Sequence, residues 1–150
     1  MRFLHRSSII FVLLIGLDQI TKQLVVWYSS QLSHIRLGPL VGVVPFRNYH
    51  FAFSLPVPIW AMYAFYGLIL STMLFYLYTS WQNLHLYQKQ AWLLVLAGAI
   101  SNIGERIILG YVNDFIYIYG GAIINIADIY ILTGLICLLL YDIFANQKKN

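Results

Sequence analysis

The chain has 150 residues, of which 61% are hydrophobic and only 9% are charged, and its formal net charge is +4. Soluble domains carry about a quarter of charged residues, so this composition excludes a soluble globular protein and predicts an integral membrane protein with a single domain, residues 1–150. The Lys and Arg residues are scattered along the chain. They form no basic stretch of the kind that binds nucleic acid, and we expect no nucleic-acid partner.

The first apolar segment, about residues 7–28, is long enough to cross a bilayer, which takes about 20 residues. Its basic start is typical of a signal peptide, but no small-residue cleavage site follows, so we expect an uncleaved span. Asp18 and Lys22 lie in this span, on one helical face. A charge at mid-bilayer costs about 2.5–3.5 kcal/mol. The two residues therefore either serve only as each other's partner or help to shape a functional site.

The next segment, residues 29–58, forms the first outer loop. Its prolines and glycines, among them Pro39 and Pro45, interrupt any spanning helix. Short strands fit here, with one expected at Leu40–Phe46 and a second β-prone piece at Asn48–Leu55. Because strand backbone cannot lie unpaired in hydrocarbon, we expect these pieces at the interface or against the helices.

Three more spans follow, at about residues 59–78, 91–109 and 123–144, separated by a polar connector (80–90) and a second outer loop (110–122). The second span carries no charge, and we expect its Tyr and Phe residues to serve packing. The sequence thus predicts an all-α membrane protein with four transmembrane helices.

The orientation of the spans follows from the Lys and Arg residues. The outer loops contain two basic residues, Arg36 and Arg47. The other side of the membrane holds five: Arg2, Arg6, Lys89, Lys148 and Lys149. The positive-inside rule then places both termini in the cytoplasm.

Most other polar residues fall near the outer ends of the spans: Asn48, Asn102, Glu105, Arg106, Asn113, Asp114, Asn125 and Asp128. A turn at Gly120 and Gly121 would bring Asp114 and Asp128 to the same membrane face. Two carboxylates held close share one proton, so that one serves as base and the other as acid. Such a pair can activate water against an amide carbonyl and then protonate the departing amine, as in aspartic proteases.

Other chemistries have weaker support in the sequence. Cys137 lies in an apolar run and is expected to be a packing residue, while Asp142 is explained by a solvated helix end. His50, next to Asn48, could serve ligation or proton transfer, but packing in an aromatic-rich loop is the favoured explanation. The spacing of His and Cys residues does not favour a metal site. A small transporter or channel subunit with an acidic relay remains an alternative.

Four motifs occur in order along the chain: DQITK (18–22), NYHFAFS (48–54), GAISNIGERIILGYVNDF (98–115) and NIAD (125–128). They resemble the DQxTK, NxGxAFS, GGxxGNxxDRxxxGxVxDF and NxAD motifs of lipoprotein signal peptidase, also called signal peptidase II. The resemblance covers nearly the whole chain.

This resemblance implies that Asp114 and Asp128 are the catalytic aspartates. It also implies positions that line or support the site: Asn48, Asn102, Arg106, Asn125, Asp18 and Lys22. The fold implied is four transmembrane helices with a small extracytoplasmic β-cradle from the first outer loop. The implied reaction is cleavage of diacylglyceryl-modified prolipoproteins before the lipidated cysteine. It takes place in the bacterial inner membrane with the site facing the periplasm, without metal or organic cofactor, and is inhibited by globomycin-type cyclic peptides.

The chain departs from the family pattern at several positions. Glu105 stands where the family has Asp, and Asn113 is polar where an apolar residue is expected. The other departures are Ser101 and His50 in place of Gly, Phe51 in place of a small residue, and Ile124 and Ile129 around the last motif. The loop between the two aspartates is also shorter than usual. A catalytically inert, lipoprotein-binding relative is the alternative that these departures suggest.

Overall fold

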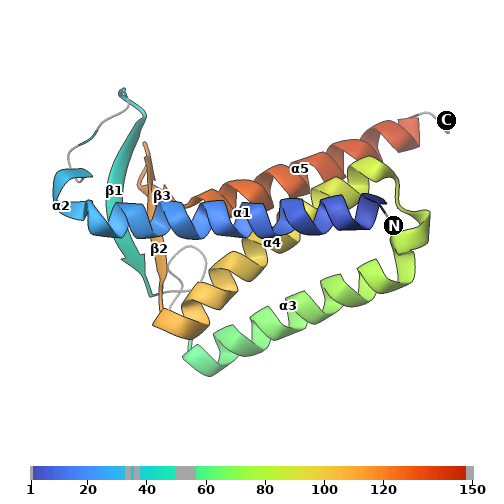
Figure 1. Cartoon of the computed structure of the whole chain (residues 1–150), viewed down its shortest axis with the longest axis horizontal. Helices are drawn as coiled ribbons and strands as arrows, with labels where there is room; N and C mark the ends of the chain where they lie inside the picture. Colours follow the sequence, from blue (N-terminus) through green and yellow to red (C-terminus); the bar gives the residue numbers. More distant parts are fainter. Residues whose placement is uncertain (1, 33–34, 36–37, 50–56, 148–150) are drawn as a thin grey trace.

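The computed structural model describes residues 2–32, 35, 38–49 and 57–147. Within these residues, four long helices form a bundle, and a three-stranded antiparallel sheet lies at one end of it (Figure 1). The long helices are α1 (Arg2–Trp27), α3 (Ile59–Ser80), α4 (Leu86–Leu109) and α5 (Ile126–Gln147). The short helix α2 (Ser29–Leu32) follows α1, and the 3-10 turn η2 (Trp81–Asn83) lies between α3 and α4. The predicted fold of four membrane-spanning helices with a small β-cradle is confirmed.

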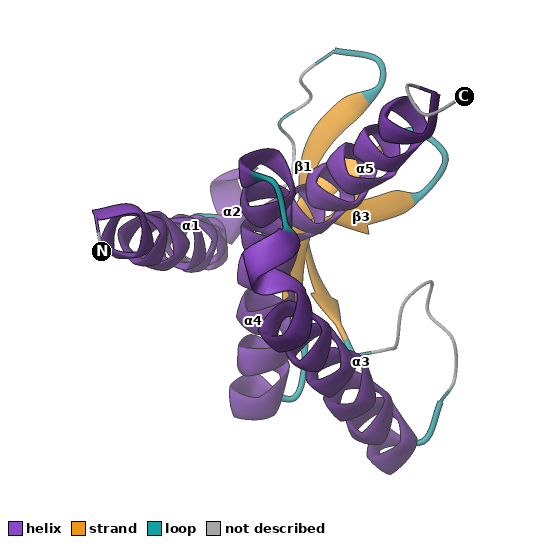
Figure 2. Ribbon diagram, turned by 90° about the vertical axis from the view of Figure 1, so that its right-hand side faces the viewer, coloured by secondary structure: helices purple, strands orange, loops and turns teal. Residues whose placement is uncertain are grey.

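Four helical stretches are long and apolar enough to cross a membrane: Ser7–Trp27 in α1, Ile59–Asn83 in α3 and η2, Leu86–Leu109 in α4 and Ile126–Ala145 in α5. Many of their large apolar side chains are exposed, as expected where the neighbour is hydrocarbon rather than water. Helix α4 is the most enclosed of the four, and Figure 2 shows it between α1 and α5. Helix α3 is the least enclosed, since it buries only Met62 and Leu77 of its residues, all of which the structure describes.

Two glycines allow α4 and α5 to approach closely. A side chain at Gly98 would collide with the backbone carbonyl of Ala127, and one at Gly134 would collide with the carbonyl of Ala91. Small residues at a helix interface allow this kind of contact in membranes. The contact at Gly98 places the first turn of α5 directly against α4.

The sheet consists of β1 (Val41–Asn48), β2 (Val112–Ile118) and β3 (Ala122–Ile124), in the order β1-β2-β3. The cradle was expected from the first outer loop, but this loop supplies only β1 among the described residues. The other two strands come from the second loop. There Gly110 ends α4 with a φ of 80°, and Gly120 and Gly121 make the hairpin turn with φ of 106° and 97°. Glycine adopts these angles without steric cost, so the chain reverses twice within a short distance.

Three predictions about the helices are corrected. Helix α4 begins at Leu86 rather than Ala91, because the Gln88 side chain accepts a hydrogen bond from the His85 backbone N–H (3.0 Å) and so helps to start the helix earlier. Helix α5 begins after Asn125 rather than at Ile123, because the preceding residues pair with β2. Cys137 is exposed on α5 instead of packed inside the protein, since much of this helix faces outward.

Several predictions lie outside the described residues. They concern His50, Phe51, most of the β-prone piece Asn48–Leu55, Lys148 and Lys149.

Candidate active site

Asp114 and Asp128 are joined by one asparagine. Asn125 lies between β3 and α5 and is fully buried. Its side-chain Nδ2 donates a hydrogen bond to Asp114 Oδ1 (2.7 Å), and its backbone N–H donates one to Asp128 Oδ2 (3.1 Å). The β2–β3 hairpin, which turns at Gly120 and Gly121, therefore returns the chain so that both carboxylates meet at one residue.

Asp114 lies on β2 and is only 3% exposed. Besides the bond from Asn125, its Oδ2 accepts a hydrogen bond from Asn48 Nδ2 on β1 (3.0 Å). Burial raises the pKa of Asp114 to about 6, with a further contribution from the charge of Asp128, while the two asparagine donors oppose the rise. A carboxylic acid with such a pKa can hold or release a proton near neutral pH.

Asp128 lies in the first turn of α5. Its Oδ1 accepts a hydrogen bond from Asn102 Nδ2 on α4 (2.8 Å), and its Oδ2 accepts the bond from Asn125. The start of a helix favours negative charge because the unpaired N–H groups and the helix dipole point toward it. The two carboxylates therefore differ in their surroundings, one on a strand and the other at a helix N-terminus.

Lys22 is the centre of a buried polar cluster next to the aspartates. It is fully buried, and its Nζ lies 2.8 Å from each of three oxygens, which belong to Asp18, Glu105 and Asn102. An ammonium group has three N–H donors, so these neighbours match its capacity. Asn102 links Lys22 to Asp128, because its side-chain oxygen accepts a bond from Lys22 and its side-chain nitrogen donates one to Asp128.

Asp18 connects α1 to the start of α5. Its Oδ1 accepts a hydrogen bond from the backbone N–H of Ala127 (2.9 Å), and its Oδ2 accepts one from Ser101 Oγ (2.6 Å). Asp18 and Lys22 are thus each other's ion-pair partner and also contact the elements that carry the site. The ion pair is therefore not their only contact, and a supporting role at the site stays a prediction.

Arg106 contacts the site indirectly. Its guanidinium donates to Tyr66 Oη (2.6 Å) and to the backbone carbonyl of Asn48 (3.1 Å), and its own backbone carbonyl accepts a bond from Tyr63 Oη (3.1 Å). It therefore holds β1 and α3 against the end of α4. Every site residue predicted from the sequence lies in one connected network.

Sequence reasoning missed some members of this network. Tyr63 and Tyr66 were expected to serve packing, yet their hydroxyl groups bond to Arg106. The available signal was that a partly buried tyrosine hydroxyl usually has a polar partner. Gln19 was also missed; its Nε2 donates to Ser101 Oγ (2.9 Å). Among the residues that the structure describes, no three His, Cys, Asp or Glu side chains are grouped as a metal ion requires.

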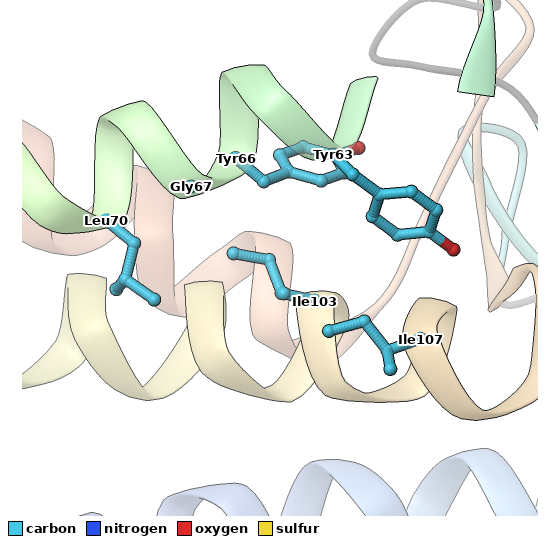
Figure 3. A pocket seen from close by; sticks show the side chains of 6 residues that line it. All are labelled: Tyr63, Tyr66, Gly67, Leu70, Ile103 and Ile107. Atoms are coloured by element: carbon cyan, nitrogen blue, oxygen red, sulfur yellow. The ribbon is translucent and has the colours of Figure 1, made fainter. Parts of the chain in front are cut away.

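An apolar groove of about 540 Å³ lies between α3 and α4, next to this network. The residues that line it are Tyr63, Tyr66, Gly67, Leu70, Ile103 and Ile107. In Figure 3 Leu70 of α3 and Ile103 of α4 point toward each other across the gap. Tyr66 belongs to both the groove and the network through its bond to Arg106.

Known proteins match the chain over nearly its whole length. The family model for signal peptidase (SPase) II matches residues 10–144. The lipoprotein signal peptidase of Haemophilus influenzae is 33% identical, covering 99% of this chain and 88% of that protein. The lipoprotein signal peptidase of Thermodesulfovibrio yellowstonii is 31% identical, covering 97% of both chains.

A solved structure shares the fold. It is described as "Bacterial membrane enzyme structure by the in meso method at 2.3 A resolution" and matches with a TM-score of 0.81 at 24% identity, covering 99% of this chain and 93% of that chain. The sequence matches set aside the transporter alternative. They show that this multi-pass membrane protein belongs to the lipoprotein signal peptidase (SPase II) family of aspartic peptidases.

Proposed function

We propose that Asp114 and Asp128 are the catalytic pair of this lipoprotein signal peptidase. The observation that carries the proposal is the pair of hydrogen bonds from Asn125, one to each carboxylate. Asn48, Asn102, Asn125, Arg106, Asp18 and Lys22 support the pair through the contacts described above.

The reaction needs one ionised and one protonated carboxyl group. The ionised group takes a proton from a water molecule while the water oxygen attacks the carbonyl carbon of the scissile amide. The protonated group donates its proton to the carbonyl oxygen. The tetrahedral intermediate then collapses and the C–N bond breaks. The carboxyl group that took the proton from water gives it to the departing amine nitrogen, and the other carboxylate takes back the hydroxyl proton as the new carbonyl forms. The asparagines hold both carboxyl groups in place during these transfers, which lowers the cost of orienting them.

The substrate is a diacylglyceryl-modified prolipoprotein, which the enzyme cuts just before the lipidated cysteine. Both the lipid and the signal helix of such a substrate already lie in the bilayer, so lateral access between helices suits it. The groove between α3 and α4 supports this route, because it is apolar and reaches the network at Tyr66. A membrane lipid would occupy the same groove between reaction cycles.

The site faces the periplasmic side of the bacterial inner membrane, and both termini face the cytoplasm. The distribution of Lys and Arg supports this orientation. In Figure 1 the start of α1 and the end of α5 lie at the end of the bundle away from the sheet. Residues 1–150 work as one transmembrane peptidase domain.

Cleavage of a lipidated prolipoprotein by Asp114→Asn and Asp128→Asn variants tests the catalytic pair. Each change should lower kcat at least about a thousandfold, since groups that act as a unit fail together. Asp142→Asn is the matched control, because Asp142 is an exposed aspartate on α5 outside the network. Substantial cleavage by either site variant would refute the assignment. Binding of a globomycin-type cyclic peptide by a wild-type protein that cleaves nothing would identify an inert relative instead.

A further inference from the structure

Glu105 and Asn113 form a buried polar pair beside the aspartates. Glu105 lies near the end of α4 and is 4% exposed, while Asn113 lies on β2 and is 5% exposed. Glu105 Oε1 accepts hydrogen bonds from Asn113 Nδ2 (2.5 Å) and from the Asn113 backbone N–H (3.3 Å). Residue 113 is therefore held by its side chain and its backbone at the same oxygen.

The other oxygen of Glu105 contacts a different partner. Oε2 lies 2.8 Å from Lys22 Nζ, so the side chain connects β2 to the buried ammonium group. Lys22 also contacts Asn102, which bonds to Asp128. The Lys22 ammonium group is thus linked to both aspartates. Asn102 connects it to Asp128, and Glu105 connects it to Asn113, the residue before Asp114.

We propose that Glu105 and Asn113 act together as positioning residues that fix the β2 backbone at Asp114, and so set the place of its carboxylate relative to Asp128. The inference rests on the proposed catalytic pair. Asn113 directly precedes Asp114, so a backbone held at residue 113 leaves the next residue little freedom. The two residues do not touch the reacting atoms; they act through Asp114.

The lengths of the two side chains fit this role. Glu105 reaches Lys22 with one oxygen and Asn113 with the other. An aspartate at this position would be one methylene shorter and would lose one of the two contacts. An apolar residue at position 113 would leave Oε1 with the longer backbone bond alone, and a buried carboxylate oxygen without good donors is unfavourable. These two departures from the family pattern are therefore in direct contact and depend on each other.

A double-mutant cycle with Asn113→Val, Glu105→Leu and the double variant tests the proposal, because leucine removes the oxygen that accepts the Asn113 bonds. Each single change should lower kcat at least about tenfold, because small misplacements of reacting groups are costly. KM should stay within about twofold, since both residues are buried and would act only through Asp114. The double variant should be no slower than the slower single variant, as expected for two residues that act through one contact. Asn83→Val, at an exposed asparagine in η2, is the matched control.

Glu105→Asp provides a second variant that keeps the charge beside Lys22. It should also lower kcat at unchanged KM, and its thermal unfolding should show a folded protein. A wild-type kcat in Asn113→Val or in Glu105→Asp would overturn the inference, and so would additive losses in the cycle. These outcomes can be distinguished from an error in the catalytic assignment. If Asp114 is not catalytic, the Asp114→Asn variant itself will still cleave the substrate.

Discussion

Asn125 and Asp128 are hydrogen-bonded to each other twice. Asn125 Oδ1 accepts a bond from the Asp128 backbone N–H (2.9 Å), and Asp128 Oδ2 accepts one from the Asn125 backbone N–H (3.1 Å). This reciprocal pattern is a capping box, which satisfies N–H groups at the start of a helix. One carboxylate of the proposed pair is therefore part of the structure that begins α5, and its position is set by the helix itself.

Asn125 combines this capping role with its bond to Asp114, and two substitutions separate the roles. Asn125→Ser keeps a cap acceptor but removes the donor to Asp114, whereas Asn125→Ala removes both. We expect both variants to lose most of their cleavage activity. Only the alanine variant should also lose about 1 kcal/mol of unfolding free energy, because it lacks the cap. Cleavage assays and thermal unfolding in detergent measure the two effects. Full cleavage by Asn125→Ser would mean that Asn125 serves only as a cap.

The raised pKa of Asp114 predicts a pH-dependent cost in stability. The pKa is about 6 in the folded protein against 3.8 for the unperturbed group. The folded state therefore binds more protons between these values, and stability falls as the pH rises through this window. Asp114→Asn removes the titration. Its melting temperature, relative to wild type, should rise by a few degrees between about pH 4 and pH 7. A difference that does not change with pH would contradict the burial of an ionisable Asp114.

The same pKa predicts where activity is lost at high pH. The pair needs one shared proton, so kcat/KM should decline above about pH 6 as that proton leaves. Asn48 donates to Asp114 and lowers its pKa, so Asn48→Ala should move this decline to higher pH. The pH profiles of both proteins with a lipidated substrate measure the shift. A decline that moves to lower pH would show that Asn48 does not stabilise the ionised carboxylate.

The helices and the acidic residues could be predicted from the sequence because both depend on local patterns. Apolar runs of bilayer length indicate spans wherever they occur. Asp114 and Asp128 stand out because the chain has only five acidic residues. The turn at Gly120 and Gly121 was also visible, since consecutive glycines are strong turn signals.

The strands of the second loop and the buried contacts could not be predicted in the same way. A run such as Val112–Ile118 is too short for its periodicity to distinguish a strand from part of a helix, and its pairing with β1 joins distant parts of the chain. Lys22 similarly finds Glu105 and Asn102 on another helix. The sequence gives residue types at such sites, whereas the partners are set by packing.

Lys22 should be among the residues on which stability depends most. Lys22→Met leaves the carboxylates of Asp18 and Glu105 buried without their shared cation, which should cost about 3–5 kcal/mol. Combining it with Asp18→Asn and Glu105→Gln should restore part of this loss. Lys89→Met is the matched control, because Lys89 lies over the Trp81 ring and such a contact contributes about 0.5–1 kcal/mol. Equal effects of Lys22→Met and Lys89→Met on thermal unfolding would contradict the role of Lys22.

The groove between α3 and α4 can be filled without disturbing the fold. A side chain added at Gly67 meets nothing within 4 Å of its Cβ, so Gly67→Leu should fold and extend into the groove. If the lipid of the substrate lies there, KM should rise about tenfold at nearly unchanged kcat, because uniform binding is lost. Gly16→Leu is the control, since Gly16 on α1 also has open space around it but does not line the groove. Equal KM values for the two variants with a diacylglyceryl substrate would show that the lipid takes another path.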